Sequence, residues 1–595
     1  MLQTYRLVQL LGYLFLVLGP VAHPPEWPRN AYVRDGDSFD FIIVGAGSAG
    51  AVLASRLSEV REWRVLLLEA GGDPPMESVV PGLLGSLVHS EFDWDYYSLD
   101  DGYSAQAQRT PGRVPLTRGK MLGGSSSINA MLYVRGNPED YNSWARMGFE
   151  GWDWSSVFPY FLKNEQFQVD ELLKDPVHGP YHNADGPVKV TVQDTIDPNV
   201  ANKLEIIADS FQEIGINRVI DYNGPEQFGV SYSYFSHSKP PGVRSSTAQS
   251  YLVPAREREN LYVLKYAYAT KIIIDESNVA RGVEVQLQDY TKLNLYAHKE
   301  VIVSAGSLNN PKLLIASGIG THEDVERLNV ELVSDLPVGY NLQDHFWLPT
   351  FFTGAHSSLL NVNDSLPKTT LDYYPEPRLN GFFSIQNFDR PDIQSEAFYF
   401  NQSSALLPML NASLNYNDEV IQSIINPNAD NEIVLVSIIL LHPKSRGRVI
   451  VHSADKDVDP EFYLGYLSNR EDLVLVREGI KRILGLTQTK YFKHVDSKFV
   501  KVDLPECDHY EFLSDPYLEC YIRYLGRTVW HQASTCAMGR VVDKDLRVFG
   551  VARLRVVDAS VMPTLTSGNT NVPTMMIGEK ASDIIKKYYL KLHDI

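Results

Sequence analysis

Residues 39–58 read FDFIIVGAGSAGAVLASRLS, and this stretch decides the fold. It opens with a short apolar run, FIIV, of the kind that forms a buried parallel strand. Gly45, Gly47 and Gly50 follow in G-x-G-x-x-G spacing, and the residues after them favour a helix. The first glycine allows a tight turn, the second lets a pyrophosphate approach the main chain, and the third lets helix and strand pack closely. The stretch therefore predicts a Rossmann-like dinucleotide site at the N-terminus of a helix.

Glu69 adds a second part to this prediction. It ends another expected strand, residues 64–68, and comes nineteen residues after Gly50. A carboxylate at this position can accept hydrogen bonds from a ribose 2′-hydroxyl and would repel a 2′-phosphate. Glycine-rich turns also occur without a ligand, but the strands, the glycines, the helix and the acid together predict a bound dinucleotide. On these residues alone, NAD and FAD fit equally well.

The chain as a whole is acidic and has an ordinary globular composition. It has 595 residues, of which 44% are hydrophobic and 21% charged, and a formal net charge of −19. This length allows a large core and suggests about two to four domains. A chain so negative has no long-range attraction for nucleic acid or for an anionic membrane, so we expect neither as a partner.

The first 22 residues have the layout of a secretory signal peptide. Arg6 is followed by residues 7–18, which are apolar apart from Gln9, and then by Pro20, Val21 and Ala22. The apolar run is short for a membrane span, although an uncleaved anchor is the alternative. We therefore expect a secreted, extracellular protein with signal peptide 1–22 and no stable membrane insertion.

The cysteines and the glycosylation sequons agree with secretion. Of the three cysteines, Cys507 and Cys520 could pair across a short loop and leave Cys536 free. Three N-x-S sequons predict surface loops of a glycoprotein. They begin at Asn363, Asn401 and Asn411.

A second glycine-rich segment lies at residues 117–136, TRGKMLGGSSSINAMLYVRG. Gly123 and Gly124 allow close approach to the main chain, and three serines follow as small hydroxyl donors. A flavin or a phosphate could therefore rest here, and a plain helix N-cap is the alternative. Before this segment, residues 71–116 lack periodicity. We expect them to form a long connection that covers another part of the fold. After it, the aromatic residues of segment 141–166 have helical spacing and are expected in the core.

Further elements of the same sheet are expected later in the chain. Strands are predicted over residues 257–275, 282–295 and 300–305, and the last of them leads into a helix over residues 310–317. Residues 346–440 look irregular, as an inserted or capping region would. The chain therefore reads as one discontinuous nucleotide domain interleaved with a substrate-facing region.

Two C-terminal clusters carry groups suited to chemistry. The segment WHQASTCAMG at residues 530–539 contains His531, which can accept a proton from an alcohol while a hydride leaves the carbon. A buried structural histidine is the alternative. The segment SGNTNVP at residues 567–573 places Asn569 and Asn571 in a turn before a helix. They can hydrogen-bond a substrate oxygen or a flavin edge, although turn geometry alone could also explain them.

These motifs, in this order, resemble the glucose–methanol–choline (GMC) family of FAD-dependent oxidoreductases, and within it the insect glucose-dehydrogenase-like branch. The resemblance covers residues 40–585 and includes VGAGSAG, segments 119–142 and 306–320, HPKSRGRV, the HQxSTCxMG block and VVDASVMPTLTSGNTNVPT. It implies an α/β fold in which a Rossmann-like FAD-binding domain is interleaved with a substrate-binding domain built on an antiparallel sheet with helices. The implied FAD-binding region spans residues 38–345, with substrate-domain segments at about 155–230. Residues 346–525 would be mainly substrate-binding, and residues 526–595 would return to the FAD and the active site.

The resemblance also assigns roles to matching residues. His531 would be the active-site base and Asn569 its partner beside the flavin. No metal is expected, and the residues that would line FAD are Gly45, Gly47, Gly50, Glu69, Ala70, Gly123, Gly124, Ser125, Asn129, Trp530, Asp558, Ala559 and Asn571. Ile128 occupies a position where some relatives carry a histidine that tethers the flavin, so we expect non-covalent FAD.

The implied reaction is the oxidation of a primary or secondary alcohol or a sugar. His531 would take the hydroxyl proton, hydride would pass to flavin N5, and oxygen or a quinone-type acceptor would reoxidise the flavin. A cyanohydrin lyase on the same fold and a catalytically silent secreted flavoprotein are the alternatives. An NAD enzyme is disfavoured because FAD-binding segments match in both halves of the chain.

Overall fold

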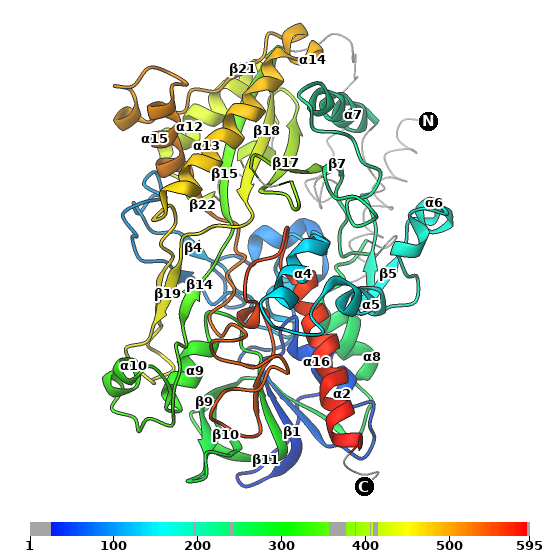
Figure 1. Ribbon diagram of the computed structural model, residues 1–595, viewed down its shortest axis with the longest axis vertical. Helices are drawn as coiled ribbons and strands as arrows, with labels where there is room; N and C mark the ends of the chain where they lie inside the picture. The colour runs from blue at the N-terminus through cyan, green and yellow to red at the C-terminus, as the bar shows by residue number, and fades with distance from the viewer. Residues whose placement is uncertain are drawn as a thin grey trace, which may run out of the picture.

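The computed structural model describes residues 25–193, 198–238, 242–355, 377–386, 388–404, 406–408 and 414–591. The expected signal peptide and the sequons at Asn363 and Asn411 lie outside these residues, whereas Asn401 is described and exposed. Across the described part, no helix combines the length and the apolar character that a membrane crossing needs. Two sheets lie toward opposite ends of the long axis of the molecule (Figure 1).

The first sheet contains the strand that leads into the glycine loop. Its parallel strands lie in the order β8, β2, β1, β11, β23, and a hairpin of β9 and β10 pairs antiparallel with the first part of β11. These strands are β1 (Ser38–Val44), β2 (Val65–Leu68), β8 (Leu261–Leu264), β9 (Ala267–Ile274), β10 (Ala280–Leu287), β11 (Lys292–Val303) and β23 (Leu554–Val556). Because both faces of the central parallel strands are covered, β2 is apolar throughout instead of alternating.

Two helices from opposite ends of the chain lie side by side against this sheet (Figure 1). They are α2 (Gly50–Leu57) and α16 (Asn571–Lys591). The Arg56 guanidinium forms hydrogen bonds of 2.8–3.0 Å with the fully buried Glu579 carboxylate. Gly578 allows the close approach, since a Cβ there would lie 3.1 Å from the main-chain oxygen of Ala49. The last helix of the chain therefore completes the packing of the first.

The second sheet is antiparallel throughout. Its strands lie in the order β21, β15, β18, β17, β16, β7, and β22 also pairs with β15. They are β7 (Gly229–Tyr232), β15 (Phe346–Ala355), β16 (Leu379–Phe383), β17 (Ile393–Phe400), β18 (Asn431–Leu440), β21 (Lys498–Phe499) and β22 (Arg527–Thr528). Helices α13 (Arg470–Leu484) and α15 (Asp515–Leu525) pack on the β15–β18 part of this sheet (Figure 1).

The predicted fold class is confirmed: the protein is α/β, with a parallel nucleotide-type sheet and a separate antiparallel sheet covered by helices. The strand and helix around the glycine loop are where the sequence predicts them, and so is α9 (Asn310–Ala316). Tyr141, Trp144 and Phe161 are buried in the core, as expected. Cys507 and Cys520 form a disulfide, and Cys536 is free and buried.

Two expectations about strands were wrong. The described residues of segment 346–440 are not irregular, because β15, β17 and β18 form the centre of the antiparallel sheet. These strands are buried on both faces, so they lack the alternation that marks a strand in sequence. The break between the strands expected over 282–295 and 300–305 was also misplaced. The chain turns between β10 and β11, where Tyr290 has a φ of 67°, and β11 then continues to Val303.

Candidate active site

A cavity of about 500 Å³ extends from the glycine loop after β1 to the antiparallel sheet. Thirteen of the fifteen residues that the sequence assigns to FAD or catalysis line it. They are Gly45, Gly47, Glu69, Ala70, Gly124, Ser125, Asn129, Trp530, His531, Asp558, Ala559, Asn569 and Asn571. Gly50 and Gly123 do not line the cavity, and both lie in the loops that border it.

The three glycines of the first loop have different surroundings. Gly45 has a φ of +98°, and a Cβ there would lie 2.5 Å from the Ser304 carbonyl oxygen. A Cβ on Gly50 would lie 1.9 Å from the carbonyl oxygen of Gly45. A Cβ on Gly47 would meet nothing within 4 Å. Packing therefore requires the first and third glycines, whereas the second leaves open space in front of the main chain, as a bound pyrophosphate needs.

Glu69 follows β2 and lies beside the first glycine loop. Its carboxylate oxygens accept hydrogen bonds from the main-chain N–H groups of Ala46, at 3.0 Å, and Gly71, at 2.9 Å. Burial raises the pKa of this carboxyl group to about 7. Glu69 thus holds the loop in shape while it lines the cavity, as a residue that faces a ribose would.

The second glycine segment packs directly on the first. The Gly123 N–H donates to the Ala46 carbonyl oxygen at 2.8 Å. A Cβ on Gly124 would lie 2.8 Å from the Gly47 Cα. Residues 124–127 form a short 3-10 helix, so the serines do lie at the start of a helix, as the N-cap alternative expects. Ser125 at this start also lines the cavity. The two glycine segments therefore make one continuous wall.

Two polar contacts join the C-terminal segments to this wall. Ser48 Oγ donates to Asn571 Oδ1 at 2.7 Å, which ties the start of α2 to the start of α16. Asp558, two residues after β23, accepts hydrogen bonds from the Gly306 N–H at 2.8 Å and from Asn310 Nδ2 at 2.7 Å. The predicted residues from the two ends of the chain therefore meet at one edge of the parallel sheet.

His531 and Asn569 lie together at the other end of the cavity. His531 Nε2 is 3.2 Å from Asn569 Nδ2, and the two residues are 8% and 9% exposed. Asn569 Oδ1 accepts a hydrogen bond from Gln394 Nε2 on β17, at 3.2 Å. Because its oxygen is taken by Gln394, the amide of Asn569 presents its N–H group to the imidazole.

A second histidine fixes the proton on His531. His345 Nδ1 lies 2.9 Å from His531 Nδ1. Burial lowers the pKa of His345 to about 3. Burial, His345 and the charge of Arg118 hold the pKa of His531 well below its usual range. Both rings are therefore neutral and share one N–H between them. Since Nε2 of His531 accepts from Asn569, the proton of the ring lies on Nδ1 and its lone pair lies on Nε2.

Strand register brings these two histidines together. Phe346 at the start of β15 pairs with Thr528 of β22, and Gln343 forms a bridge with Ala533. The neighbouring Asp344 is buried and accepts hydrogen bonds from the His531 N–H, Thr528 Oγ1, Gln532 Nε2 and Tyr466 Oη. Asp344 and His345 were missed in the sequence, since no pattern there marks the pairing of segments almost two hundred residues apart.

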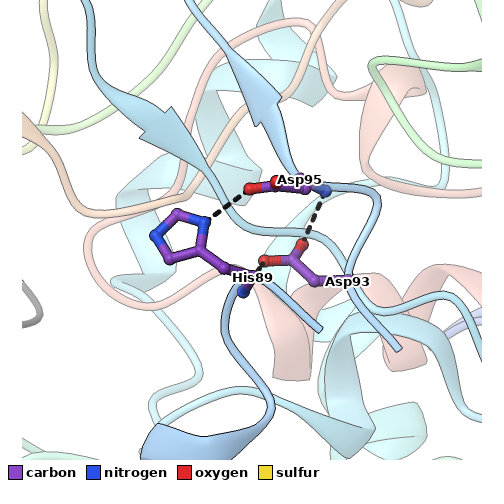
Figure 2. Close-up of side chains that lie close together, drawn as sticks. All are labelled: His89, Asp93 and Asp95. Atoms are coloured by element: carbon purple, nitrogen blue, oxygen red, sulfur yellow. Dashed lines mark hydrogen bonds and ion pairs between the residues drawn. The ribbon is translucent and has the colours of Figure 1, made fainter. Parts of the chain in front are cut away.

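A group of polar side chains supports the loop before the second glycine segment (Figure 2). The possible ligand atoms of His89, Asp93 and Asp95 lie within 4.8 Å of one another. However, Asp93 accepts hydrogen bonds from the main-chain N–H groups of His89, Asp95 and Arg118, and His89 Nδ1 faces Asp95 Oδ1. The Arg118 guanidinium in turn donates to the Trp530 carbonyl oxygen. These contacts explain the group as a support for the residue before His531.

The donors and spaces of the cavity suit FAD. The open space before Gly47, the acid at Glu69 and the joined glycine segments form one end, and the His531 imidazole, a candidate base, lies at the other. A dinucleotide needs the first three features, and a redox reaction of an alcohol needs the last.

Comparisons with known proteins show the family of this chain. Residues 39–347 and 443–578 match the two GMC oxidoreductase profiles. Ecdysone oxidase of Bombyx mori is 36% identical over 573 residues, which cover 95% of this chain and 84% of that protein. Glucose dehydrogenase [FAD, quinone] of Drosophila melanogaster is 34% identical, with 92% and 87% covered. The crystal structure of pyridoxine 4-oxidase from Mesorbium loti has a TM-score of 0.75 at 26% identity, covering 91% of this chain and 98% of that one. The chain therefore belongs to the GMC oxidoreductases, a family of FAD-dependent enzymes that act on CH–OH donors.

Proposed function

We propose that this protein is a secreted FAD-dependent oxidoreductase that oxidises an alcohol or sugar, with His531 as the base. One observation carries the proposal: the unprotonated Nε2 of His531 faces the Asn569 amide at the cavity wall. An alcohol oxygen that contacts both groups would replace their mutual hydrogen bond. It would meet one acceptor for its proton and one donor for the charge that develops as the proton leaves.

The residues that would hold FAD come from both ends of the chain. Gly47 and the start of α2 would face the pyrophosphate, and Glu69 would accept from a ribose hydroxyl. The wall formed by Gly124, Ser125 and Asn129, together with Trp530, Asp558, Ala559 and Asn571, would surround the rest. When bound, FAD supplies the acceptor for the hydride that leaves the substrate carbon.

The chain's own residues prepare the alcohol for that transfer. His531 Nε2 takes the hydroxyl proton, and His345 keeps the other ring nitrogen of His531 protonated. Asn569 Nδ2 donates to the substrate oxygen, because Gln394 holds the amide in this orientation. Burial of both residues excludes water, which strengthens these interactions.

We infer that FAD is held without a covalent bond. Ile128 lines the cavity next to Asn129 and has no nucleophilic atom. Acid precipitation of the holoprotein should release the flavin into the supernatant, and a yellow pellet would contradict the inference.

The electron acceptor is oxygen or a quinone-type compound. Measuring peroxide release with and without an added quinone distinguishes these two acceptors.

The proposed role of His531 is tested by anaerobic reduction of the flavin with alcohols and sugars. We expect His531→Ala to bind FAD and to reduce it at least about a hundredfold more slowly. His452→Ala is the matched control, because His452 pairs with Glu461 on the surface. An unchanged reduction rate in His531→Ala would remove this residue from catalysis.

The same experiment separates the alternatives. A cyanohydrin lyase would cleave mandelonitrile while no alcohol bleached its flavin, and a silent flavoprotein would do neither.

Secretion belongs to the same proposal. The supporting observations are the apolar layout of residues 1–22 and the Cys507–Cys520 disulfide, which suits an oxidising compartment. Expression in insect cells should place the protein in the medium. Treatment with a glycosidase would show whether Asn401, which is exposed, carries a glycan.

A further inference from the structure

A row of side chains leads from Asn569 along one face of the antiparallel sheet. On β17, Gln394, Glu396 and Phe398 share a face, because successive side chains of a strand point in opposite directions. Gln394 contacts Asn569, while Glu396 and Phe398 line the cavity. Two residues of a strand span about 6.5 Å. Glu396 therefore lies one such step from the residue that holds the active-site amide.

The Glu396 carboxylate is buried, and one of its oxygens has no partner. Glu396 is 5% exposed, and its Oε2 lies 3.6 Å from Arg378 Nη1. Oε1 is buried without a hydrogen bond. Burial raises the pKa of this carboxyl group, against the opposing effect of the Arg378 charge. A buried acceptor left unpaired costs free energy, and a donor on a bound molecule would remove that cost.

The surroundings of Glu396 combine apolar walls with positive charge. Phe398 is in register with Leu435 of β18, and both line the cavity together with Trp347. The Arg378 guanidinium lies 4.3 Å from the centre of the Phe398 ring. An apolar skeleton therefore fits these walls.

We propose that Glu396 determines substrate specificity by accepting a hydrogen bond from a second hydroxyl group of the alcohol. The substrate class is then a neutral diol or polyol with an apolar skeleton. Its reacting carbinol lies at His531, and its second hydroxyl reaches Glu396 Oε1. This inference rests on the proposed alcohol oxidation. It also predicts that choline, whose quaternary ammonium group has no hydrogen to donate to Glu396 Oε1, is a poor substrate.

The test compares two alcohols that differ in one hydroxyl group. The probes are trans-1,4-cyclohexanedimethanol and trans-4-methylcyclohexanemethanol, which share the ring and the reacting carbinol. Two quantities are measured for each probe on the holoenzyme: the dissociation constant from the perturbed flavin spectrum, and the rate of anaerobic flavin reduction. We expect the wild-type enzyme to bind the diol about tenfold to a hundredfold more tightly, as a hydrogen bond to a charged group allows.

Variants assign this preference to Glu396. Glu396→Leu should abolish the difference between the two probes, and Glu396→Gln, which keeps a weaker acceptor of the same size, should retain part of it. If Glu396→Leu fails to fold because the charge opposite Arg378 is removed, the double variant R378M/E396L removes both charges and gives the same readout. FAD content and melting temperature are measured for each variant.

The outcomes separate this inference from the proposed function. A preference for the diol that disappears in the leucine variant supports the inference. Equal binding of the two probes by the wild-type enzyme, or a preference that survives in Glu396→Leu, overturns it. If the diol binds more tightly but neither probe nor any other alcohol reduces the flavin, the hydroxyl site stands and the proposed alcohol oxidation falls.

Discussion

His345 Nδ1 lies 2.9 Å from His531 Nδ1, with the two imidazole planes at 86° to each other. When two neutral rings face each other through their Nδ1 atoms, one Nδ1 must carry the proton and the other must accept it. The proton on one side of His531 therefore depends on the lone pair that His345 offers. In the proposed reaction His345 is therefore a positioning residue, because it would act on the substrate only through His531.

Replacement of His345 should slow flavin reduction without removing FAD. In His345→Phe, the Nδ1–H of His531 has no acceptor, so the ring can move its proton to Nε2 and lose the lone pair that faces the substrate. A wrong tautomer of a catalytic histidine is costly, and we expect a loss of at least about tenfold. His345→Gln offers an amide oxygen and should recover part of the rate. Stopped-flow reduction measures both variants, and equal rates for Phe and Gln would contradict the tautomer argument.

The pH dependence of substrate oxidation should reflect the burial of His531. Its pKa lies well below the ordinary value of 6.5, so the ring stays neutral as the pH falls through that value. Protonation below the lowered pKa removes the lone pair, so kcat/KM should be flat through pH 6.5 and decline only in more acidic buffer. Anaerobic flavin reduction across the pH range measures this profile. An acid limb centred at or above pH 6.5 would show that the base is more solvated than the structure indicates.

The glycines of the first loop offer a matched pair of variants. Gly50→Ala brings a Cβ to 1.9 Å from the Gly45 carbonyl oxygen, so it should destabilise the apoprotein. Gly47→Ala meets no atom within 4 Å and should leave the melting temperature of the apoprotein unchanged. Its methyl group projects toward the expected pyrophosphate and should weaken FAD binding. Differential scanning fluorimetry and FAD titration measure the two effects, and a loss of stability in Gly47→Ala would contradict this division of roles.

Asp344 should contribute both stability and activity. It is a buried carboxylate that accepts four hydrogen bonds from the segment carrying His531 and from Tyr466. In Asp344→Asn, an N–H group faces donors, so we expect the free energy of unfolding to fall by about 1–3 kcal/mol. Flavin reduction should fall with it, because His531 loses its main-chain anchor. Chemical denaturation measures the stability, with the exposed Asp430→Asn as control; an unchanged midpoint would show that Asp344 is dispensable.

The parts of the fold and of the candidate site that could be predicted from the sequence lie within short stretches of the chain. The glycine loop, Glu69 and the strands beside them belong to one short stretch, so spacing alone indicates the site. His531 and Asn569 also lie within recognisable segments. Gln394 and Glu396 belong to a strand that is buried on both faces, where the alternation of apolar and polar residues is lost, and His345 directly precedes another such strand, β15. Their role depends on the register of β15, β17 and β22, which pairs residues far apart in the chain.

The contact of Ser48 with Asn571 has a consequence for biosynthesis. The glycine loop is made near the start of translation, yet its partner helix, α16, is made last. A nascent chain can form β1 and α2, but it lacks the groups that close the cofactor cavity until its final residues leave the ribosome. Loading of FAD should therefore follow chain completion, and a chain that stops before Asn571 should leave the ribosome unable to retain flavin. Bound flavin would therefore mark a chain whose synthesis is complete.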